Sequence, residues 1–367
     1  MAKEVVFVGP RQVEVREYEE RAPGPREILV RNRYSSISHG TERSHYRGEA
    51  IWHRKRVEAD GFVTDGFNMQ HPFTYGYEDV AAVVAIGPQV TEVQIGDMVA
   101  CSAHHRETRI FNLDNPSGGA TGTAGVAVTL SLPVLPKDDN MDKYVFISLG
   151  TVALDAVLLG APKLGESVVV IGQGVVGLLT TQMCKLAGAD PVIAVDLVDS
   201  RLKVAKNLGA DYVFNPKHGD VGREVQKVLG GHGADVCFEC SGSAGGIGLA
   251  LHCGTPFPIV ICEGMYDGPA TDLHLGEEFC RSAGQILHSR AGGFRLGPEM
   301  GAENSYYHRK WDLPRVTKTV INLLQSGKLN VDGLISHRFR LEQAKIAYEL
   351  IDQHPEQVTK VIFDLTL

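Results

Sequence analysis

The sequence predicts an α/β protein in which a doubly wound parallel sheet is joined to a second, mostly β domain. Two patterns along the 367 residues indicate this fold. Residues 1–155 contain short extended runs separated by Gly and Pro turns, which is typical of a β domain. From about residue 156, apolar strands alternate with helical stretches, as they do when helices connect the strands of a parallel sheet. We therefore expect one domain over 1–155 and another over 156–312.

The expected elements follow from hydrophobic period and turn residues. In the first domain, extended runs are expected at 5–8, 12–15, 28–30, 80–86 and 96–100. In the second, strands are expected at 167–171, 192–195, 212–214, 236–240, 259–262 and 285–289. Helical spacing occurs between them at 178–186, 201–208 and 223–229. The last part of the chain predicts a helix over 313–324, a strand over 337–339, a helix over 341–351 and a closing strand over 360–365.

The most informative motif is a G-x-G-x-x-G turn that directly follows the apolar run 168–171. In such a turn, Gly172 permits the tight bend, Gly174 lets the backbone approach a pyrophosphate, and Gly177 lets helix and strand pack closely. Asp196 ends the next apolar run, where its carboxylate can accept hydrogen bonds from a ribose 2′-hydroxyl. Strand, turn, helix and acid in this order predict a dinucleotide site rather than an ordinary glycine loop.

NAD is the expected cofactor. Leu197, and no Arg, follows Asp196, so a 2′-phosphate would meet like charge. Arg201 lies nearby in sequence and keeps NADP as the alternative. The residues expected to contact the cofactor are Gly172, Gly174, Val175, Val176, Gly177, Asp196, Arg201, Cys240 and Ser241.

Composition restricts the partners and the compartment. The formal net charge is −8 and no basic block is present, which argues against nucleic acid as a partner. No apolar run reaches the length of a membrane span, and the N-terminal segment lacks the apolar core of a signal peptide, so we expect a cytoplasmic protein. The seven cysteines are scattered, which indicates reduced, mostly buried thiols. Cys237 and Cys240 have C-x-x-C spacing but lie in a strand pattern, which favours two core cysteines over a redox pair.

Several short segments resemble the medium-chain dehydrogenase/reductase superfamily, and together they span nearly the whole chain. The matching segments are 37–42 (ISHGTE), 76–78 (GYE), 96–99 (GDMV), 326–329 (SGKL) and 334–337 (LISH). The resemblance implies an oxidoreductase with a GroES-like catalytic domain, a Rossmann domain that binds the cofactor, and a return of residues 313–367 to the catalytic domain. It also implies a small polar substrate and a homodimer or homotetramer.

Zinc-dependent members of this superfamily bind catalytic zinc through a Cys of the first loop, the His of Gly-His-Glu and a Cys, Glu or Asp before the linking helix. The corresponding positions here are Ser38, Tyr77 and roughly Ser148. Hydroxyl groups are poor zinc ligands. The superfamily's four-cysteine structural zinc lobe is also missing, because no cysteine lies between Cys101 and Cys184. We therefore expect a zinc-free member without a metal site.

Without zinc, a side chain must take the hydroxyl proton of an alcohol substrate. The resemblance places Thr41 at a proton-relay hydroxyl and Tyr77 at a vacated ligand position, and His39 is a third catalytic candidate. Tyr77 is alternatively a filler of the space that zinc would occupy. For Glu42 and Glu78 we expect salt bridges or backbone hydrogen bonds.

Ser38, Tyr46 and Asp155 are the expected substrate contacts, with a simple helix role as the alternative for Asp155. Hydroxyl and imidazole groups are abundant around the first loop, at Ser38, His39, Thr41, His45, Tyr46, Trp52 and His53. These groups suit a polyhydroxylated substrate, meaning a sugar, cyclitol or polyol, oxidised at a secondary hydroxyl. Two alternatives stay open: an NAD(P)H-dependent reductase of enones or quinones, and a cofactor-binding protein without turnover. Residues 292–310 are expected to line a polar pocket or a dimer contact.

Overall fold

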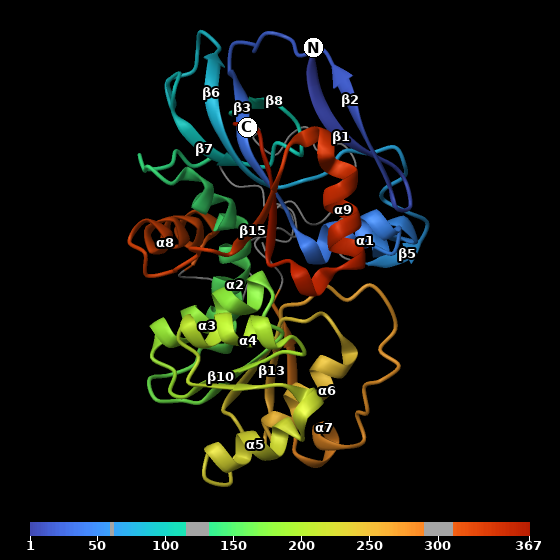
Figure 1. Ribbon diagram of the computed structural model, residues 1–367, viewed down its shortest axis with the longest axis vertical. Coiled ribbons are helices and arrows are strands. Elements are labelled where there is room, and N and C mark those ends of the chain that lie inside the picture. The colour runs from blue at the N-terminus through green and yellow to red at the C-terminus, as the bar shows by residue number, and fades with distance from the viewer. Residues whose placement is uncertain (59–61, 115–131, 290–310) are drawn as a thin grey trace. The chain divides into compact units, whose positions relative to one another are not determined.

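The computed structural model describes residues 1–58, 62–114, 132–289 and 311–367 (Figure 1). The described residues form two compact units. Unit 1 contains the described parts of 1–148 and 312–367, and unit 2 contains residues 149–289 and Trp311. The expected boundary at 155/156 falls inside helix α2 (Ile147–Gly160), which continues through it without a break. The segment 292–310, for which a pocket or a dimer contact was expected, lies outside the described residues.

Unit 1 is built around a six-stranded sheet with the order β15-β16-β3-β6-β7, in which β8 also pairs with β3. Its strands are β3 (Glu27–Ile37), β6 (Glu78–Ile86), β7 (Met98–Cys101), β8 (Thr108–Asn112), β15 (Ile335–Phe339) and β16 (Lys360–Asp364). Two antiparallel pairs accompany it: β1 (Ala2–Gly9) with β2 (Gln12–Tyr18), and β4 (Lys55–Val57) with β5 (Val63–Asp65). Because β16 pairs antiparallel with β3, C-terminal residues complete a sheet begun near the N-terminus.

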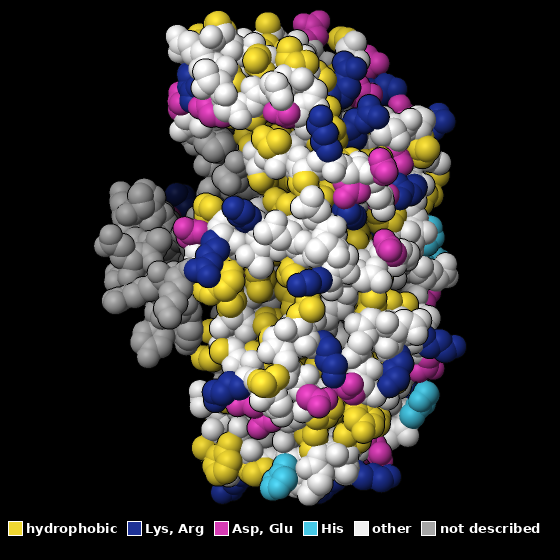
Figure 2. Space-filling view, turned by 90° about the vertical axis from the view of Figure 1, so that its left-hand side faces the viewer, with side chains coloured by type: hydrophobic (Ala, Val, Ile, Leu, Met, Phe, Trp, Pro, Cys, Tyr) yellow, Lys and Arg dark blue, Asp and Glu magenta, His cyan; other side chains and the backbone are white. Residues whose placement is uncertain are grey.

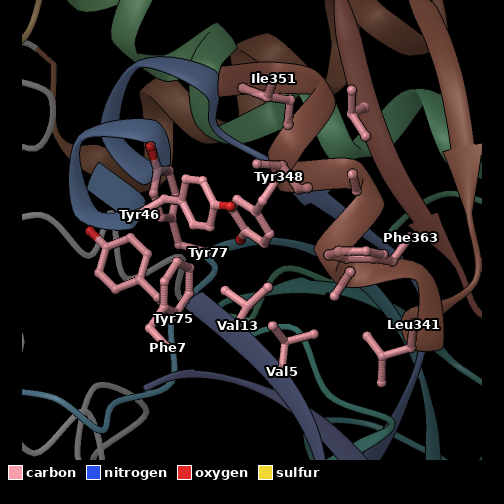
Figure 3. Close-up of a cluster of buried hydrophobic side chains, with 14 of the residues drawn as sticks. Val5, Phe7, Val13, Tyr46, Tyr75, Tyr77, Leu341, Tyr348, Ile351 and Phe363 are labelled. Carbon is pink, nitrogen blue, oxygen red and sulfur yellow. The ribbon is translucent and has the colours of Figure 1, made fainter. Parts of the chain in front are cut away.

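The helices of unit 1 flank this sheet. They are α1 (His39–Arg47), η1 (Ile51–His53), η2 (Met141–Phe146), α8 (Leu313–Gln325), η6 (Leu341–Gln343), α9 (Ala344–Gln353) and η7 (Pro355–Gln357). Part of the segment expected as a first loop is thus helical, and α1 ends at Gly48, whose φ of 72° is the left-handed conformation typical of a helix C-terminus. The largest side chains of the core come from both ends of the sequence and include Phe7, Tyr348 and Phe363 (Figure 3).

Unit 2 contains a six-stranded parallel sheet with the order β11-β10-β9-β12-β13-β14. The strands are β9 (Val168–Ile171), β10 (Val192–Val195), β11 (Tyr212–Phe214), β12 (Val236–Glu239), β13 (Ile259–Cys262) and β14 (Gln285–His288). The helices are α3 (Val175–Ala187), α4 (Asp199–Asn207), α5 (Val221–Val228), α6 (Ala244–Cys253) and α7 (Glu278–Arg281), with η3 (Pro216–His218). Chain order reverses between β9 and β12, and ligands of such sheets bind beyond the carboxyl ends of the strands at this switch point.

The predicted fold class is confirmed. The expected strands at 192–195, 212–214 and 259–262 coincide with β10, β11 and β13. All residues of β9, β10 and β12 are buried, which explains why these strands are continuous apolar runs in the sequence. Helix α6 was missed, because its sequence AGGIGLALHC contains three glycines, which disfavour a helix. Ser243 compensates as N-cap, since its side chain accepts the backbone N–H of Gly246.

The apolar helix content, the surface charge and the burial of the cysteines bear on the expected partners and compartment. Among the described residues, one helical stretch, Met141–Gly160, is long and apolar enough to cross a membrane, but 78% of its apolar window is buried inside the protein, as in a core helix. On the face drawn in Figure 2, Lys and Arg side chains are interspersed with Asp and Glu. All seven cysteines are free, and five of them are buried, in agreement with the expectation of mostly buried thiols; Cys240 is partly buried and Cys280 is exposed.

Candidate functional site

The three glycines of the turn between β9 and α3 each have different geometric surroundings. Gly172 has a φ of +88°, a conformation that favours glycine. A side chain at Gly177 would collide with the carbonyl oxygen of Gly172, so glycine is needed for α3 to approach this closely. A Cβ at Gly174 would meet no described atom within 4 Å. The space beside Gly174 is therefore open, and it adjoins the N-terminus of α3, whose backbone N–H groups attract anions.

Asp196 follows β10 and is tied to the glycine turn. Its carboxylate accepts hydrogen bonds from the backbone N–H groups of Gln173, at 2.6 Å, and Val198, at 2.8 Å. The Arg201 guanidinium lies 4.0 Å from the same carboxylate. The backbone bonds hold the carboxylate in one orientation. Because a carboxylate has about four lone-pair sites, it can still accept hydrogen bonds from a ligand hydroxyl.

The loop after β12 packs against the same glycine turn. A Cβ at Gly172 would lie 2.8 Å from the backbone nitrogen of Ser241, so turn and loop touch at the switch point. Glu239, fully buried at the end of β12, accepts the backbone N–H of Ser241 at 2.9 Å and thereby fixes the loop. The Cys240 thiol donates to Glu263 at 3.4 Å, and burial raises its pKa well above the usual value, so it is protonated.

Three hydroxyl-bearing side chains meet in unit 1: Ser38, Thr41 and Tyr77, which we name the hydroxyl cluster. The Tyr77 phenol donates to Ser38 Oγ at 2.5 Å, and its oxygen also lies 3.3 Å from Thr41 Oγ1. Ser38 is the N-cap of α1, yet its hydroxyl makes no capping bond. Burial, with a contribution from Glu78, raises the pKa of Tyr77, so the phenol is protonated at neutral pH. The cluster is a set of neutral hydroxyls that can pass a proton among themselves.

The two acids adjacent in sequence to the cluster are held in ion pairs. Glu42 is fully buried, lies 2.6 Å from His105 Nε2 and accepts the Tyr348 hydroxyl at 2.5 Å. Glu78 pairs with Lys360, which is also fully buried. Burial raises the pKa of Glu78, although the Lys360 ammonium opposes this shift. The expected structural roles of Glu42 and Glu78 are confirmed by these contacts.

Known proteins match this chain over both units. Residues 24–134 match the model of the alcohol dehydrogenase GroES-like domain, and residues 175–295 match that of zinc-binding dehydrogenase. D-guloside 3-dehydrogenase of Escherichia coli (strain K12) is 30% identical over 378 residues, covering 98% of this chain and 99% of the relative. L-threonine 3-dehydrogenase of Pyrococcus horikoshii is 31% identical over 362 residues, covering 94% and 92%.

The chain belongs to the medium-chain dehydrogenase/reductase superfamily. It is an enzyme of the dehydrogenase class, as predicted. The crystal structure of galactitol-1-phosphate dehydrogenase from Escherichia coli has the same fold, with a TM-score of 0.73 and 21% identity over 99% of both chains.

Hydroxyl groups occupy the three positions that the resemblance assigns to zinc ligands, Ser38, Tyr77 and roughly Ser148. Ser38 and Tyr77 bond to each other, and Ser148 Oγ donates to the backbone oxygen of Tyr77 at 3.1 Å. Zinc prefers thiolate, imidazole and carboxylate ligands. Within the described ranges, no group of three or more His, Cys, Asp or Glu side chains is arranged to hold a metal. This donor set does not fit the zinc of the superfamily.

Of the predicted catalytic and substrate residues, the hydrogen bonds join Ser38, Thr41 and Tyr77. His39 is the first residue of α1 and is partly buried. Tyr46 packs in the core, with its ring stacked on Tyr348 at a centroid distance of 5.3 Å (Figure 3). Asp155 belongs to unit 2, where it accepts the Ser289 hydroxyl at 2.9 Å.

The polar groups of His45 and Trp52, which were expected to suit a polyhydroxylated substrate, are instead part of the core, and this corrects the prediction for these two residues. His45 and Trp52 are buried among aromatic rings, and His45 Nδ1 lies 3.1 Å from His53 Nε2. The His45 ring also packs 4.5 Å from the Tyr75 ring. Imidazole and indole rings stack in an apolar core as well as they line a pocket, and residue type alone does not separate the two arrangements.

Sequence reasoning missed Lys360, His105 and Tyr348, which support the site from other elements. Lys360 is the charged residue at the start of the apolar run KVIF in the closing strand. Such an isolated charge indicates a buried ion pair, so the sequence did contain a signal for this contact. His105 is fully buried, whereas the neighbouring His104 is partly buried, has a φ of 66° and bonds Thr74 at 2.8 Å.

Proposed function

We propose that this superfamily member is a zinc-independent, NAD-linked dehydrogenase that oxidises a secondary hydroxyl of a sugar, cyclitol or polyol, or reduces the corresponding ketone. The observation that carries the proposal is the hydroxyl cluster. Tyr77 bonds to Ser38 and to Thr41, at positions that the resemblance assigns to two zinc ligands and a relay hydroxyl. The neighbouring acids are neutralised inside the protein by His105 and Lys360, so they too are poor candidates for binding a metal.

In this proposal, the hydroxyl cluster handles the proton. NAD, when bound, supplies the hydride acceptor. Tyr77 exchanges a proton with the substrate oxygen and is the acid in the reduction direction. Thr41 and Ser38 orient the phenol, and His39, at the start of α1, is the candidate exit for the proton. Because burial and Glu78 raise the pKa of Tyr77, the rate of oxidation should keep rising with pH above neutrality.

The cofactor proposal rests on the geometry of unit 2. Open space beside Gly174, at the N-terminus of α3, suits a pyrophosphate that the backbone of Val175 and Val176 would contact. The Asp196 carboxylate suits a ribose diol and would repel a 2′-phosphate. Arg201 already faces this carboxylate, which supports NAD over NADP.

The substrate class follows from the cluster and from the relatives. A site made of hydroxyls matches the hydrogen-bonding groups of a polyol, and Ser38 and Asp155 are the proposed substrate contacts. The two relatives are named as 3-dehydrogenases of a guloside and of threonine, and both compounds carry hydroxyl groups. We further propose a cytoplasmic location, which the seven free cysteines support, and a homodimer or homotetramer.

A second function is favoured by one observation. The Tyr77 phenol has a raised pKa and its hydrogen bonds close within the cluster, as they would if Tyr77 only filled the space. An enone or quinone reductase does not need Tyr77 as a proton acceptor, because its substrate carries no hydroxyl proton to remove. Asp196 counts against the NADPH on which such reductases often rely.

The test combines metal analysis, cofactor titration and a substrate panel. We expect less than stoichiometric zinc, tighter binding of NADH than of NADPH by fluorescence, and NAD-dependent turnover of polyols. About one zinc per chain whose removal abolishes activity would contradict the proposal. NADPH-linked reduction of enones would support the second function, and NADH binding without any turnover would support a cofactor-binding protein.

A further inference from the structure

The buried ion pair between Glu42 and His105 lies behind the hydroxyl cluster and has no role in the proton route described above. We propose that this pair is the positioning device of the cluster: it holds Ser38 from one side and the backbone before Tyr77 from the other. The inference deepens the proposed function and rests on it for its kinetic test.

The first contact of the pair is with Ser38. Glu42 Oε1 accepts the backbone N–H of Ser38 at 2.8 Å, and the backbone N–H of Glu42 donates to the Ser38 carbonyl at 2.8 Å. These two bonds fix the Ser38 backbone to the first turn of α1, and the Ser38 hydroxyl, which would normally cap the helix, makes no capping bond. The hydroxyl thereby stays with Tyr77, at 2.5 Å.

The second contact of the pair is with the residues before Tyr77. A Cβ at Gly76 would lie 2.9 Å from His105 Cε1, so the imidazole presses directly on the Gly76 backbone. The backbone N–H of His105 donates to the Tyr75 carbonyl at 3.0 Å. Gly76 has a φ of +123°, which a side chain would strain. His105 therefore determines where the peptide before Tyr77 lies. The position of that peptide in turn sets the point from which the Tyr77 side chain extends.

The pair is itself held on every side. His105 Nδ1 lies 2.7 Å from the Ser35 hydroxyl, which donates to Asp79 at 2.5 Å. Tyr348 of α9 donates to Glu42 at 2.5 Å. Burial alone would raise the pKa of Glu42, but the His105 charge and hydrogen bond lower it below the usual value, and Glu42 raises the pKa of His105 in return. The pair is thus ionised and rigid, and it links β3, α1, β6 and α9.

The kinetic test uses Glu42→Gln, His105→Gln and the double variant. Each single change should lower kcat by roughly 30-fold or more, because a small displacement of a reacting group is that costly. KM for NAD should stay within about twofold, and the double variant should lose little more than a single one, since the pair acts as a unit. Tyr348→Phe removes one donor to Glu42 and should give a smaller loss in a protein that still folds. The control is His252→Gln, which breaks a His–carboxylate pair in unit 2, with Glu278 at 2.8 Å, and should leave kcat unchanged.

A second readout does not need turnover. In protein labelled with 13C at tyrosine Cζ, the Tyr77 resonance is assigned by its loss in Tyr77→Phe. It should shift in Glu42→Gln, His105→Gln and Tyr348→Phe, and stay unchanged in His252→Gln. A Glu42→Gln variant with a native Tyr77 resonance and a kcat within about twofold of native would overturn the inference. If the native enzyme turns over none of the panel, the proposed function fails, and the resonance alone decides whether the pair positions Tyr77.

Discussion

The glycine turn of unit 2 is shaped by backbone conformation, whereas the hydroxyl cluster of unit 1 depends on side chains that bond across the sequence. The turn lies within six consecutive residues, from Gly172 to Gly177, and what matters there is the absence of Cβ atoms. The cluster needs Tyr77 to reach Ser38, 39 positions away, and its support needs Tyr348 to reach Glu42, 306 positions away.

This contrast predicts that the two sites differ in their tolerance to side-chain substitution. A backbone-made site withstands changes in neighbouring side chains, because its function requires only conformation and open space. A site made of buried side chains is a connected network, so one altered partner is felt by the others. The predictions below test this difference, beginning with the largest expected effect.

Two alanine substitutions in the turn should separate fold from binding. Gly177→Ala places a Cβ against the Gly172 carbonyl, and we expect it to destabilise the protein by about 3 kcal/mol or more and to abolish cofactor binding. Gly174→Ala meets no described atom, so stability should change by about 1 kcal/mol or less, while NADH affinity falls roughly 100-fold. Urea unfolding and NADH fluorescence measure both. Equal loss of stability in the two variants would show that the space beside Gly174 is not open.

Removing one oxygen from the cluster tests its chemistry. Tyr77→Phe keeps the buried ring and should lower kcat roughly 100-fold with little change in the dissociation constant of NADH. The native pH profile of oxidation should rise above neutrality, because the pKa of Tyr77 is raised by burial and Glu78, and this rise should disappear in the variant. Near-native activity of Tyr77→Phe would mean that Tyr77 only fills space, and His39 would become the first candidate for the proton.

The cofactor preference depends on one carboxylate. Asp196→Asn keeps a side-chain oxygen near the backbone N–H groups of the turn but removes the charge, so the preference for NAD over NADP should narrow by roughly tenfold. Arg201→Ala is the matched control and should widen the preference, because it removes the one nearby cation. Steady-state kinetics with both cofactors provide the measurement. A native enzyme that uses NADP as well as NAD would contradict the assignment.

Acid should weaken unit 1 through His45. Burial is the main cause that lowers the pKa of this imidazole to about 3, with His53 adding to the effect. Between its ordinary value of about 6.5 and this lower value, the unfolded chain binds a proton that the folded chain does not, so stability falls as pH falls through that window. His45→Gln should therefore show a smaller drop in Tm than the native protein between about pH 7 and about pH 5. An identical drop in Tm in the variant and the native protein would show that a group other than His45 causes the acid sensitivity.

The elements that sequence reasoning found are those whose local environment is uniform. The central strands β9, β10 and β12 are buried on both faces, so their apolar runs show them directly, and the glycine turn follows one of them. The resemblance named Ser38, Thr41 and Tyr77 as site residues, and in the structure Tyr77 bonds to the other two. It did not reveal that Lys360 neutralises Glu78 or that His105 pairs with Glu42, because these contacts are set by the folded sheet and leave no local pattern. Tyr46 and His45 were interpreted as polar groups, although their rings pack in the core.

Strand β16 has a consequence for how the protein is made. Lys360 is translated 282 residues after Glu78, the carboxylate it neutralises. Throughout that interval the sheet of unit 1 lacks its closing strand, and all of unit 2 is synthesised before the strand arrives. Until Lys360 has been synthesised, Glu78 lacks the partner that neutralises it inside the folded protein. A chain stalled before β16 would contain all the strands of unit 2 but would lack the strand that pairs with β3, so the surroundings of this early strand are completed only when the end of the chain is made.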